Sequence, residues 1–209
     1  MPSRLDHIVV VAHTLAAGAE FVEKALGIPP GPGRRHAHMG THNLLLALGA
    51  CVYLEVVAVD PDAPPVSRPR WFGLDMLPPA PPARLAAWVA DTDDIRAHAS
   101  PALGAVETME REGLTWQMTA TADGSLPLAG AAPLLIQRAP GIAHPASRLP
   151  DVGLRLRRLH IRHPSPADAA ALLARIEFSA QPGIDLSQGA ACSLSAEIDT
   201  PLGVRMLGG

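Results

Sequence analysis

The stretch Leu5-Asp6-His7-Ile8-Val9-Val10-Val11-Ala12-His13-Thr14 carries the first regular pattern of the sequence. Its run of β-branched residues has the composition and length of a strand. Apolar residues then recur at intervals of three and four, and a glycine ends the series: Leu15, Ala19, Val22, Leu26 and Gly27. This spacing predicts a short amphipathic helix closed by a glycine C-cap.

Three further strands are expected after a turn rich in proline and glycine at 27–33. They occupy 34–41, 43–48 and 51–59, and Gly49-Ala50 between the last two has the length of a hairpin loop. The order of this first unit is therefore β-α-β-β-β.

The same order returns in a second unit and, in part, in a third. In the second unit a strand at 85–90 precedes Thr92-Asp93-Asp94, which offers an N-cap for a helix from about 95 to 103. Strands at 106–111, 114–120 and 133–138 complete that unit. The third unit has a strand at 156–161, a helix at 165–176 that starts with Ser165-Pro166-Ala167-Asp168, and strands near 190–198 and 204–207.

The spacing of comparable residues supports the repeat. His7 and Glu55 are 48 positions apart, Trp88 and Gln137 are 49 apart, and His160 and Glu197 are only 37 apart. The third unit is therefore expected to be shortened.

Composition excludes several classes of protein. The chain has 209 residues, 17 Lys+Arg against 20 Asp+Glu, and a formal net charge of -3, so it offers no basic stripe for nucleic acid. No apolar run reaches the roughly 18 to 20 residues that span a bilayer. Two distant cysteines, Cys51 and Cys192, form neither a disulfide framework nor a metal knuckle. We expect a cytoplasmic protein whose partner is a small molecule rather than nucleic acid or a membrane.

Several short motifs in this order resemble the glyoxalase-like branch of the vicinal oxygen chelate superfamily, which also contains bleomycin-resistance proteins and extradiol dioxygenases. The motifs are Leu5-Asp6-His7-Ile8-Val9-Val10, Met39-Gly40-Thr41-His42-Asn43-Leu44, Tyr53-Leu54-Glu55-Val56-Val57, Trp71-Phe72-Gly73-Leu74-Asp75, residues 88–94, Pro133-Leu134-Leu135-Ile136-Gln137, His144-Pro145-Ala146, and Leu159-His160-Ile161-Arg162-His163-Pro164. The resemblance covers nearly the whole chain.

The resemblance implies an α+β fold in which paired βαβββ modules form a curled mixed sheet around a cleft. The modules are expected at about 3–60 and 84–140, within a glyoxalase-like domain at 1–150. A shortened βαββ unit at 151–209 is expected to pack on that domain. Proteins of this kind often pair modules between chains, so a homodimer is one expected assembly.

His7 and Glu55 are the first candidate site residues. Each stands in an apolar strand, and a carboxylate there costs several kcal/mol to bury unless a cation or hydrogen-bond donor meets it. As neighbours in an ideal strand, Asp6 and His7 are expected to point to opposite faces. The resemblance implies His7 and Glu55 as metal ligands and catalytic groups. The alternative is a buried His–Glu hydrogen bond, or a Glu55 that faces solvent.

The second module departs from the metal-binding pattern. Trp88, which cannot ligate a cation, stands where the resemblance implies a histidine, and Gln137 stands where it implies a carboxylate. A divalent metal (Zn, Mn, Fe, Ni or Mg) would then have at best His7, Glu55 and Gln137 as protein ligands. Trp88 offers instead a flat wall for an organic ligand.

Other residues are candidate ligand contacts. His42 and Asn43 follow Gly40, which permits close backbone approach, and are placed near the cleft mouth. Trp116 alternates with Leu114 and Met118 on one strand face. Arg138, like Arg70, is suited to gripping an anionic group. His36 and His38 are interpreted as solvated strand residues, and Trp71 as core packing.

Two functions remain open. The leading one is an enzyme of the lyase, isomerase or dioxygenase type that acts on a small oxygenated or carbonyl-bearing metabolite, with His7 as ligand or base and Glu55 as ligand or general base. The other is a metal-free protein that binds or sequesters a flat compound. In a rival geometry, His160 and Glu197 of the third unit face His7 and Glu55 and complete the site.

Overall fold

The first module has the expected order of helix and strands. The computed structural model describes residues 2–111, 113–179 and 182–208. The module consists of β1 (Arg4–Val11), α1 (Leu15–Leu26), β2 (Gly31–His36), β3 (Thr41–Ala47) and β4 (Tyr53–Val59). The Thr14 hydroxyl accepts a hydrogen bond from the amide of Ala17 at the start of α1, and Gly27 closes the helix with φ 79°.

Helix α1 lies very close to the sheet. A Cβ on Gly18 would stand 2.3 Å from the Cγ1 atom of Val56, so only glycine fits at this crossing. The expected strand at 34–41 is interrupted, because a 3-10 turn η1 (Ala37–Met39) separates β2 from β3.

The second module repeats the order with β5 (Arg84–Asp91), α2 (Ile95–His98), β6 (Ala105–Arg111), β7 (Leu114–Ala120) and β8 (Leu134–Arg138). Asp94 caps α2 by accepting from the Ala97 amide. The helix has four residues, whereas the sequence predicts it to continue to about Leu103. Pro101 accounts for the early end, because a proline disfavours helical geometry in the residue before it.

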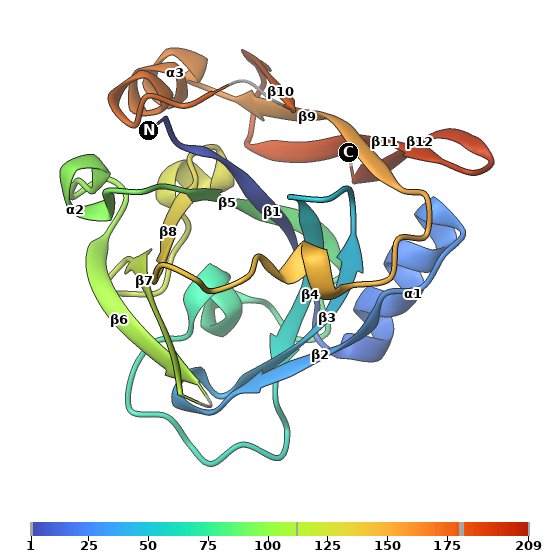
Figure 1. The fold of residues 1–209 in the computed structure, drawn as a ribbon, viewed down its shortest axis with the longest axis horizontal. Coiled ribbons are helices and arrows are strands. Elements are labelled where there is room, and N and C mark those ends of the chain that lie inside the picture. The colour runs from blue at the N-terminus through green and yellow to red at the C-terminus, as the bar shows by residue number, and fades with distance from the viewer. Residues whose placement is uncertain (1, 112, 180–181, 209) are drawn as a thin grey trace.

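The two modules share one eight-stranded sheet in the order β2-β3-β4-β1-β5-β8-β7-β6. In each module the first strand pairs in parallel with the last, and β1 and β5 meet antiparallel at the centre. Figure 1 shows this sheet curled into a half-barrel, with the chain between β8 and β9 crossing its open side. The expectation of paired βαβββ modules around a cleft is confirmed.

The C-terminal unit is a second sheet rather than a shortened copy. It contains β9 (Arg155–His163), α3 (Pro166–Arg175), β10 (Gly183–Gln188), β11 (Ser193–Thr200) and β12 (Gly203–Gly208). The order β10-β9-β11-β12 places the first strand beside the second, unlike either module. Strand β10 was missed from the sequence because its residues, Gly-Ile-Asp-Leu-Ser-Gln, carry only two large apolar side chains.

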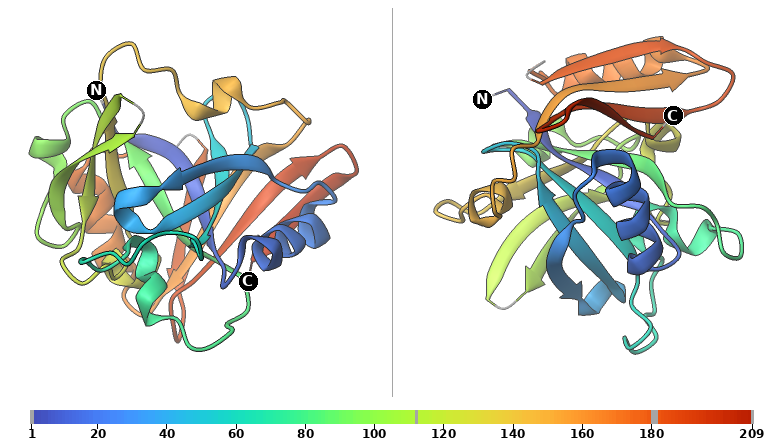
Figure 2. Two further views of the ribbon diagram at one scale, coloured as in Figure 1. Left: turned by 90° about the horizontal axis from the view of Figure 1, so that it is seen from below. Right: turned by 90° about the vertical axis from the view of Figure 1, so that its right-hand side faces the viewer.

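Two apolar clusters hold these layers together. The larger one lies between the curled sheet and the four-stranded sheet, which Figure 2 shows as separate layers, and it includes Ile8, Trp88 and Ile161. The smaller one lies inside the curl and includes Val9 and Met118.

Among the described residues, no helix has the length and apolarity needed to cross a membrane.

Three more 3-10 turns lie in the connecting segments. They are η2 (Trp71–Met76), η3 (Pro127–Gly130) and η4 (Pro145–Arg148). Of these, η2 and η4 contribute side chains to the inside of the curl.

Candidate functional site

A β-bulge in β1 turns two consecutive side chains toward the same place. In the pairing with β5, Leu5 lies opposite Ala90 and His7 lies opposite Val89, so Asp6 is the extra residue. Leu5 and Ile8 accordingly pack in the outer core. The expectation that Asp6 and His7 point to opposite faces is therefore wrong, because it assumed a regular strand.

The His7 imidazole lies between two carboxylates. Its Nδ1 atom is 2.6 Å from Oδ2 of Asp6, and its Nε2 atom is 3.3 Å from Oε2 of Glu55. Burial alone would lower the pKa of His7, but the hydrogen bonds and negative charges of Asp6 and Glu55 outweigh it and raise that pKa above 6.5. The ring also stacks on Tyr53, with centroids 4.5 Å apart. His7 is thus held in one orientation, and both carboxylates stabilise its protonated form.

Glu55 is fixed by donors on both oxygens. Asn43 donates from Nδ2 to Oε1 of Glu55 at 2.6 Å, while the Asn43 Oδ1 atom accepts from the Arg34 amide at 2.6 Å. These two bonds define which way the Asn43 amide faces. Burial raises the pKa of Glu55, but the contacts with His7 and Asn43 lower it overall, so the group is a carboxylate at neutral pH.

This chain of contacts depends on a close approach between β2 and β3. A Cβ on Gly33 would stand 2.0 Å from Oδ1 of Asn43, so Gly33 leaves the room that the amide occupies.

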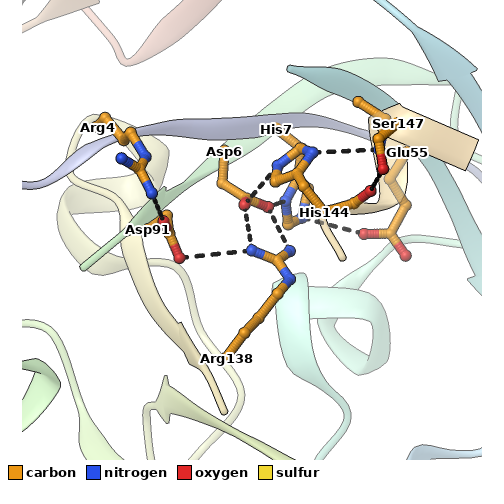
Figure 3. A network of polar contacts seen from close by, with 9 residues as sticks. Arg4, Asp6, His7, Glu55, Asp91, Arg138, His144 and Ser147 are labelled. Carbon is orange, nitrogen blue, oxygen red and sulfur yellow. Dashed lines mark hydrogen bonds and ion pairs between the residues drawn. The ribbon is translucent and has the colours of Figure 1, made fainter. Parts of the chain in front are cut away.

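Asp6 joins three segments of the chain (Figure 3). Arg138 from β8 donates to both of its oxygens, at 2.5 and 2.9 Å. His144, just before η4, donates from Nε2 to Oδ1 at 2.9 Å, and its Nδ1 atom accepts from the Ala146 amide. Burial would raise the pKa of Asp6, but the bonds from His144, His7 and Arg138 hold it well below its usual range.

A cavity of about 330 Å³ opens beside these groups. Its polar lining comprises His7, Arg34, His36, Asn43, Glu55, Arg138 and Arg148. Its apolar lining comes from both modules, from η2 and from the segment at 142–149: Pro32, Leu45, Tyr53, Trp71, Phe72, Leu114, Trp116, Met118, Ile136, Ile142, Ala143, Pro145 and Leu149. A concave apolar site with a few convergent polar groups is the form that small-molecule sites take.

Five of the residues that the sequence singles out line this cavity: His7, Asn43, Glu55, Trp116 and Arg138. His42 does not line it. As the neighbour of Asn43 in β3, His42 faces the other side, where its Nδ1 atom is 3.9 Å from Asp60.

Trp88 and Gln137 also lie away from the cavity. Trp88 is fully buried in the outer core, with its ring centroid 5.3 Å from that of Phe178. Gln137 accepts from the Ile95 amide and donates to the Asp93 carbonyl, so it fastens the start of α2. The structure therefore does not support Trp88 as a cleft wall or Gln137 as a metal ligand.

Both misplacements come from a one-residue error in aligning the modules. His7 lies opposite Tyr53 and Val89 lies opposite Leu134, so Val89 corresponds to His7 and Ile136 corresponds to Glu55. A shift of one residue exchanges the faces of a strand, which is why both predicted partners point outward.

The donors around His7 and Glu55 do not fit a divalent metal. The two positions that would supply further ligands carry Val89 and Ile136, both apolar. The Arg138 guanidinium lines the same cavity and adds positive charge. Within the described part of the chain, no group of three or more His, Cys, Asp or Glu side chains is placed to hold a metal ion.

Residues of the third unit do not complete the site. His160 and Glu197 lie on the four-stranded sheet with 3.7 Å between Nε2 and Oε2, and neither lines the cavity. The rival geometry, in which the first and third units face each other, is not formed.

Several residues that the sequence does not place in the cavity line it in the structure. His36, interpreted as solvated, is buried and lines the cavity, as does Trp71. His38 contacts the sulfur of Met109, and Arg70 pairs with Asp75. Asp6 and Tyr53 received no role, although an acid inside an apolar strand is itself a signal that a buried cation meets it.

Comparisons with known proteins agree with this architecture. A family model described as "Glyoxalase-like domain" matches residues 5–177. A hypothetical protein from Staphylococcus aureus superimposes with a TM-score of 0.62 and 12% identity, covering 92% of this chain and 88% of that one. No curated protein sequence matches the chain.

Two enzymes of known chemistry superimpose less well. A variant of Streptomyces coelicolor methylmalonyl-CoA epimerase in complex with 2-nitronate-propionyl-CoA gives a TM-score of 0.43 at 18% identity, covering 66% of this chain and 99% of that one. A variant of 4-hydroxymandelate synthase from the same organism gives 0.46 at 12% identity, with 97% and 60% covered. At these identities the likeness concerns the fold alone.

Proposed function

Because the chain belongs to the glyoxalase-like domain family, we propose that it is an enzyme that moves a proton on the carbon next to the carbonyl group of a small oxygenated metabolite. The observation that carries this proposal is the Glu55 carboxylate, held at the cavity wall with the His7 imidazole beside it. An acid and a base with separated roles at one point are what proton transfer next to a carbonyl requires.

The contacts support one role for each of three residues. Glu55 removes the proton from the carbon, and the electron pair of the broken C–H bond moves to the carbonyl oxygen as an enolate. His7 donates from Nε2 to that oxygen and stabilises the charge. Asp6 holds the other ring nitrogen at 2.6 Å and so keeps the imidazole protonated and oriented.

Glu55 then returns the proton to the carbon, so the cycle balances without a further reactant. If the planar enolate turns over in the cavity first, return of the proton to its other face gives epimerisation. Return to a neighbouring carbon gives isomerisation. Departure of a group from the enolate, with the proton on Glu55 passing to that group, gives a lyase reaction. In these reactions only Glu55 and His7, which line the cavity, exchange protons or hydrogen bonds with the substrate. No step passes through a metal, since the donors present do not fit one.

Deuterium incorporation tests the proposal. The protein is incubated in D2O, with a chelator, with a panel of small oxo acids, hydroxyaldehydes and ketones, and loss of the α-proton is followed by NMR. We expect exchange above the buffer rate for at least one compound, and a fall of about 10²-fold or more in Glu55→Gln. Arg96→Gln, an exposed change on α2, serves as the control and should exchange at the wild-type rate.

The second function, sequestration of a flat compound, is favoured by the aromatic walls at Trp71, Phe72 and Trp116. It predicts tight binding of a ligand whose protons exchange no faster than in buffer. That outcome, with equal affinity in Glu55→Gln, would contradict the enzymatic proposal.

A further inference from the structure

The charges around the cavity are unlike those of the whole chain. The formal net charge is -3, yet the lining contains Arg34, Arg138 and Arg148 against the single carboxylate of Glu55. The buried carboxylate of Asp6, which does not line the cavity, neutralises Arg138. Arg148 adds a positive charge at the cavity that no described carboxylate pairs with, and this charge attracts an anionic ligand.

Arg148 is the member of this set that is positioned to meet a ligand directly. It is exposed at the end of η4, lines the cavity, and forms no ion pair with any described residue. A guanidinium matches a carboxylate in shape and can bind it through two parallel hydrogen bonds.

The position of Arg148 is coupled to the buried site. His144 immediately precedes η4, and its Nε2 atom donates to Asp6 at 2.9 Å while its ring meets Tyr53 edge-on at 5.6 Å. Ala146, inside η4, is buried. The same carboxylate that orients His7 therefore also anchors the turn that carries Arg148.

The other walls of the cavity suit a flat apolar body. Trp71 and Phe72 from η2 and Trp116 and Met118 from β7 line it, together with Ile136. Aromatic and thioether side chains pack favourably on a planar ring. A volume of about 330 Å³ lies at the lower end for small-molecule sites, which favours one ring with a short side chain.

We infer that the substrate is a carboxylic acid that carries a carbonyl group and one flat apolar ring, with its carboxylate bound by Arg148. This inference rests on the proposed function, because it names the class of compound for the same site. Within it, the ring lies against Trp116 and the carbonyl lies beside His7 and Glu55.

Calorimetric titration of the full chain with three matched probes tests the inference. Phenylpyruvate has the ring, the carbonyl and the carboxylate; phenylacetone lacks the carboxylate; pyruvate lacks the ring. We expect phenylpyruvate to bind about tenfold or more tightly than either of the others. Raising the salt concentration should weaken the binding of phenylpyruvate and leave the binding of phenylacetone unchanged.

Arg148→Gln should lower the affinity for phenylpyruvate about five- to tenfold and leave the affinity for phenylacetone unaffected. Arg96→Gln should change neither affinity. Equal affinity for the acid and the neutral ketone, an unchanged phenylpyruvate affinity in Arg148→Gln, or no binding of any probe would each overturn the inference.

The binding result separates this inference from the proposed reaction. Binding that depends on Arg148, without any α-proton exchange that depends on Glu55, would refute the reaction and keep the ligand class. Exchange of a neutral carbonyl compound, with no effect of Arg148→Gln, would refute the ligand class and keep the reaction.

Discussion

Asp6 and His7 are neighbours in β1, and yet their side chains meet, with Oδ2 of Asp6 2.6 Å from Nδ1 of His7. In a regular strand they would stand on opposite faces. The bulge removes that separation, so a single carboxylate orients the imidazole and also binds Arg138 and His144. One irregular backbone position therefore brings the Asp6 carboxylate into contact with His7, Arg138 and His144.

Replacing this carboxylate should change the titration of His7. In Asp6→Asn the negative charge is lost, so we expect the pKa of His7 to fall from its raised value, because one of the two carboxylates that raise it is gone. The change should also destabilise the fold by about 2–4 kcal/mol, because Arg138 loses its buried partner and keeps, among the described residues, only the 3.5 Å contact with Asp91. NMR titration of the imidazole and urea unfolding measure the two effects.

The double variant Asp6→Asn with Arg138→Gln is the control for stability. It removes the guanidinium that lost its partner, and should therefore recover part of the lost unfolding free energy. The pKa of His7 should remain low. An unchanged pKa of His7 in both variants would contradict the role of Asp6.

The stability of the fold should depend on pH through the same groups. The pKa of His7 is raised in the folded state, so its contribution is fully present below pH 6.5 and is lost as the pH rises through the folded value. The pKa of Asp6 is lowered, so its contribution is present above pH 3.8 and is lost as the pH falls toward its folded value. Unfolding free energies measured from pH 3 to 9 should therefore be highest between these limits.

His7→Gln tests whether His7 causes the loss of unfolding free energy at alkaline pH. Glutamine does not titrate, so the decline in stability above pH 6.5 should become shallower in that variant. A decline of the same steepness would show that another group causes it.

The assignment of strand faces in the second module can be tested with two neighbouring residues of β8. Gln137→Ala removes hydrogen bonds to Asp93 and Ile95 and should cost about 1 kcal/mol of stability, with ligand binding unchanged. Ile136→Ala enlarges the cavity and should weaken binding of a ring-bearing ligand about tenfold. The reverse result would place Gln137 at the site.

Much of the fold follows from local pattern. The spacing of Leu15, Val22 and Leu26 together with Gly27 defines helix α1 with the bounds that the structure has. The repeated order of elements predicts both modules, because each apolar strand must be covered on at least one face. The convergence of His7 and Glu55 is a consequence of the parallel pairing of β1 with β4.

The rest of the site depends on features that periodicity does not encode. In the sequence, the bulge at Asp6 is indicated only by the spacing of Leu5 and Ile8. These two core residues are three positions apart, whereas residues on one face of a regular strand are two apart. Assigning Trp88 and Gln137 to the cavity failed because a count of residues between modules cannot fix a register to within one position. The contact of His144 with Asp6 joins positions 138 residues apart and has no local signal.

The anchoring of the segment over the cavity gives the last prediction. In His144→Ala, the bond to Asp6 and the bond from the Ala146 amide are both lost, so η4 is held less firmly. If these bonds contribute about 1–2 kcal/mol, the amides of residues 141–149 should exchange about five- to thirtyfold faster with D2O. His163→Ala, which removes a local bond to Ser165 on the other sheet, should leave that exchange unchanged. Equal exchange in the two variants would show that packing of Ala146 and Leu149, rather than the buried carboxylate, holds the segment in place.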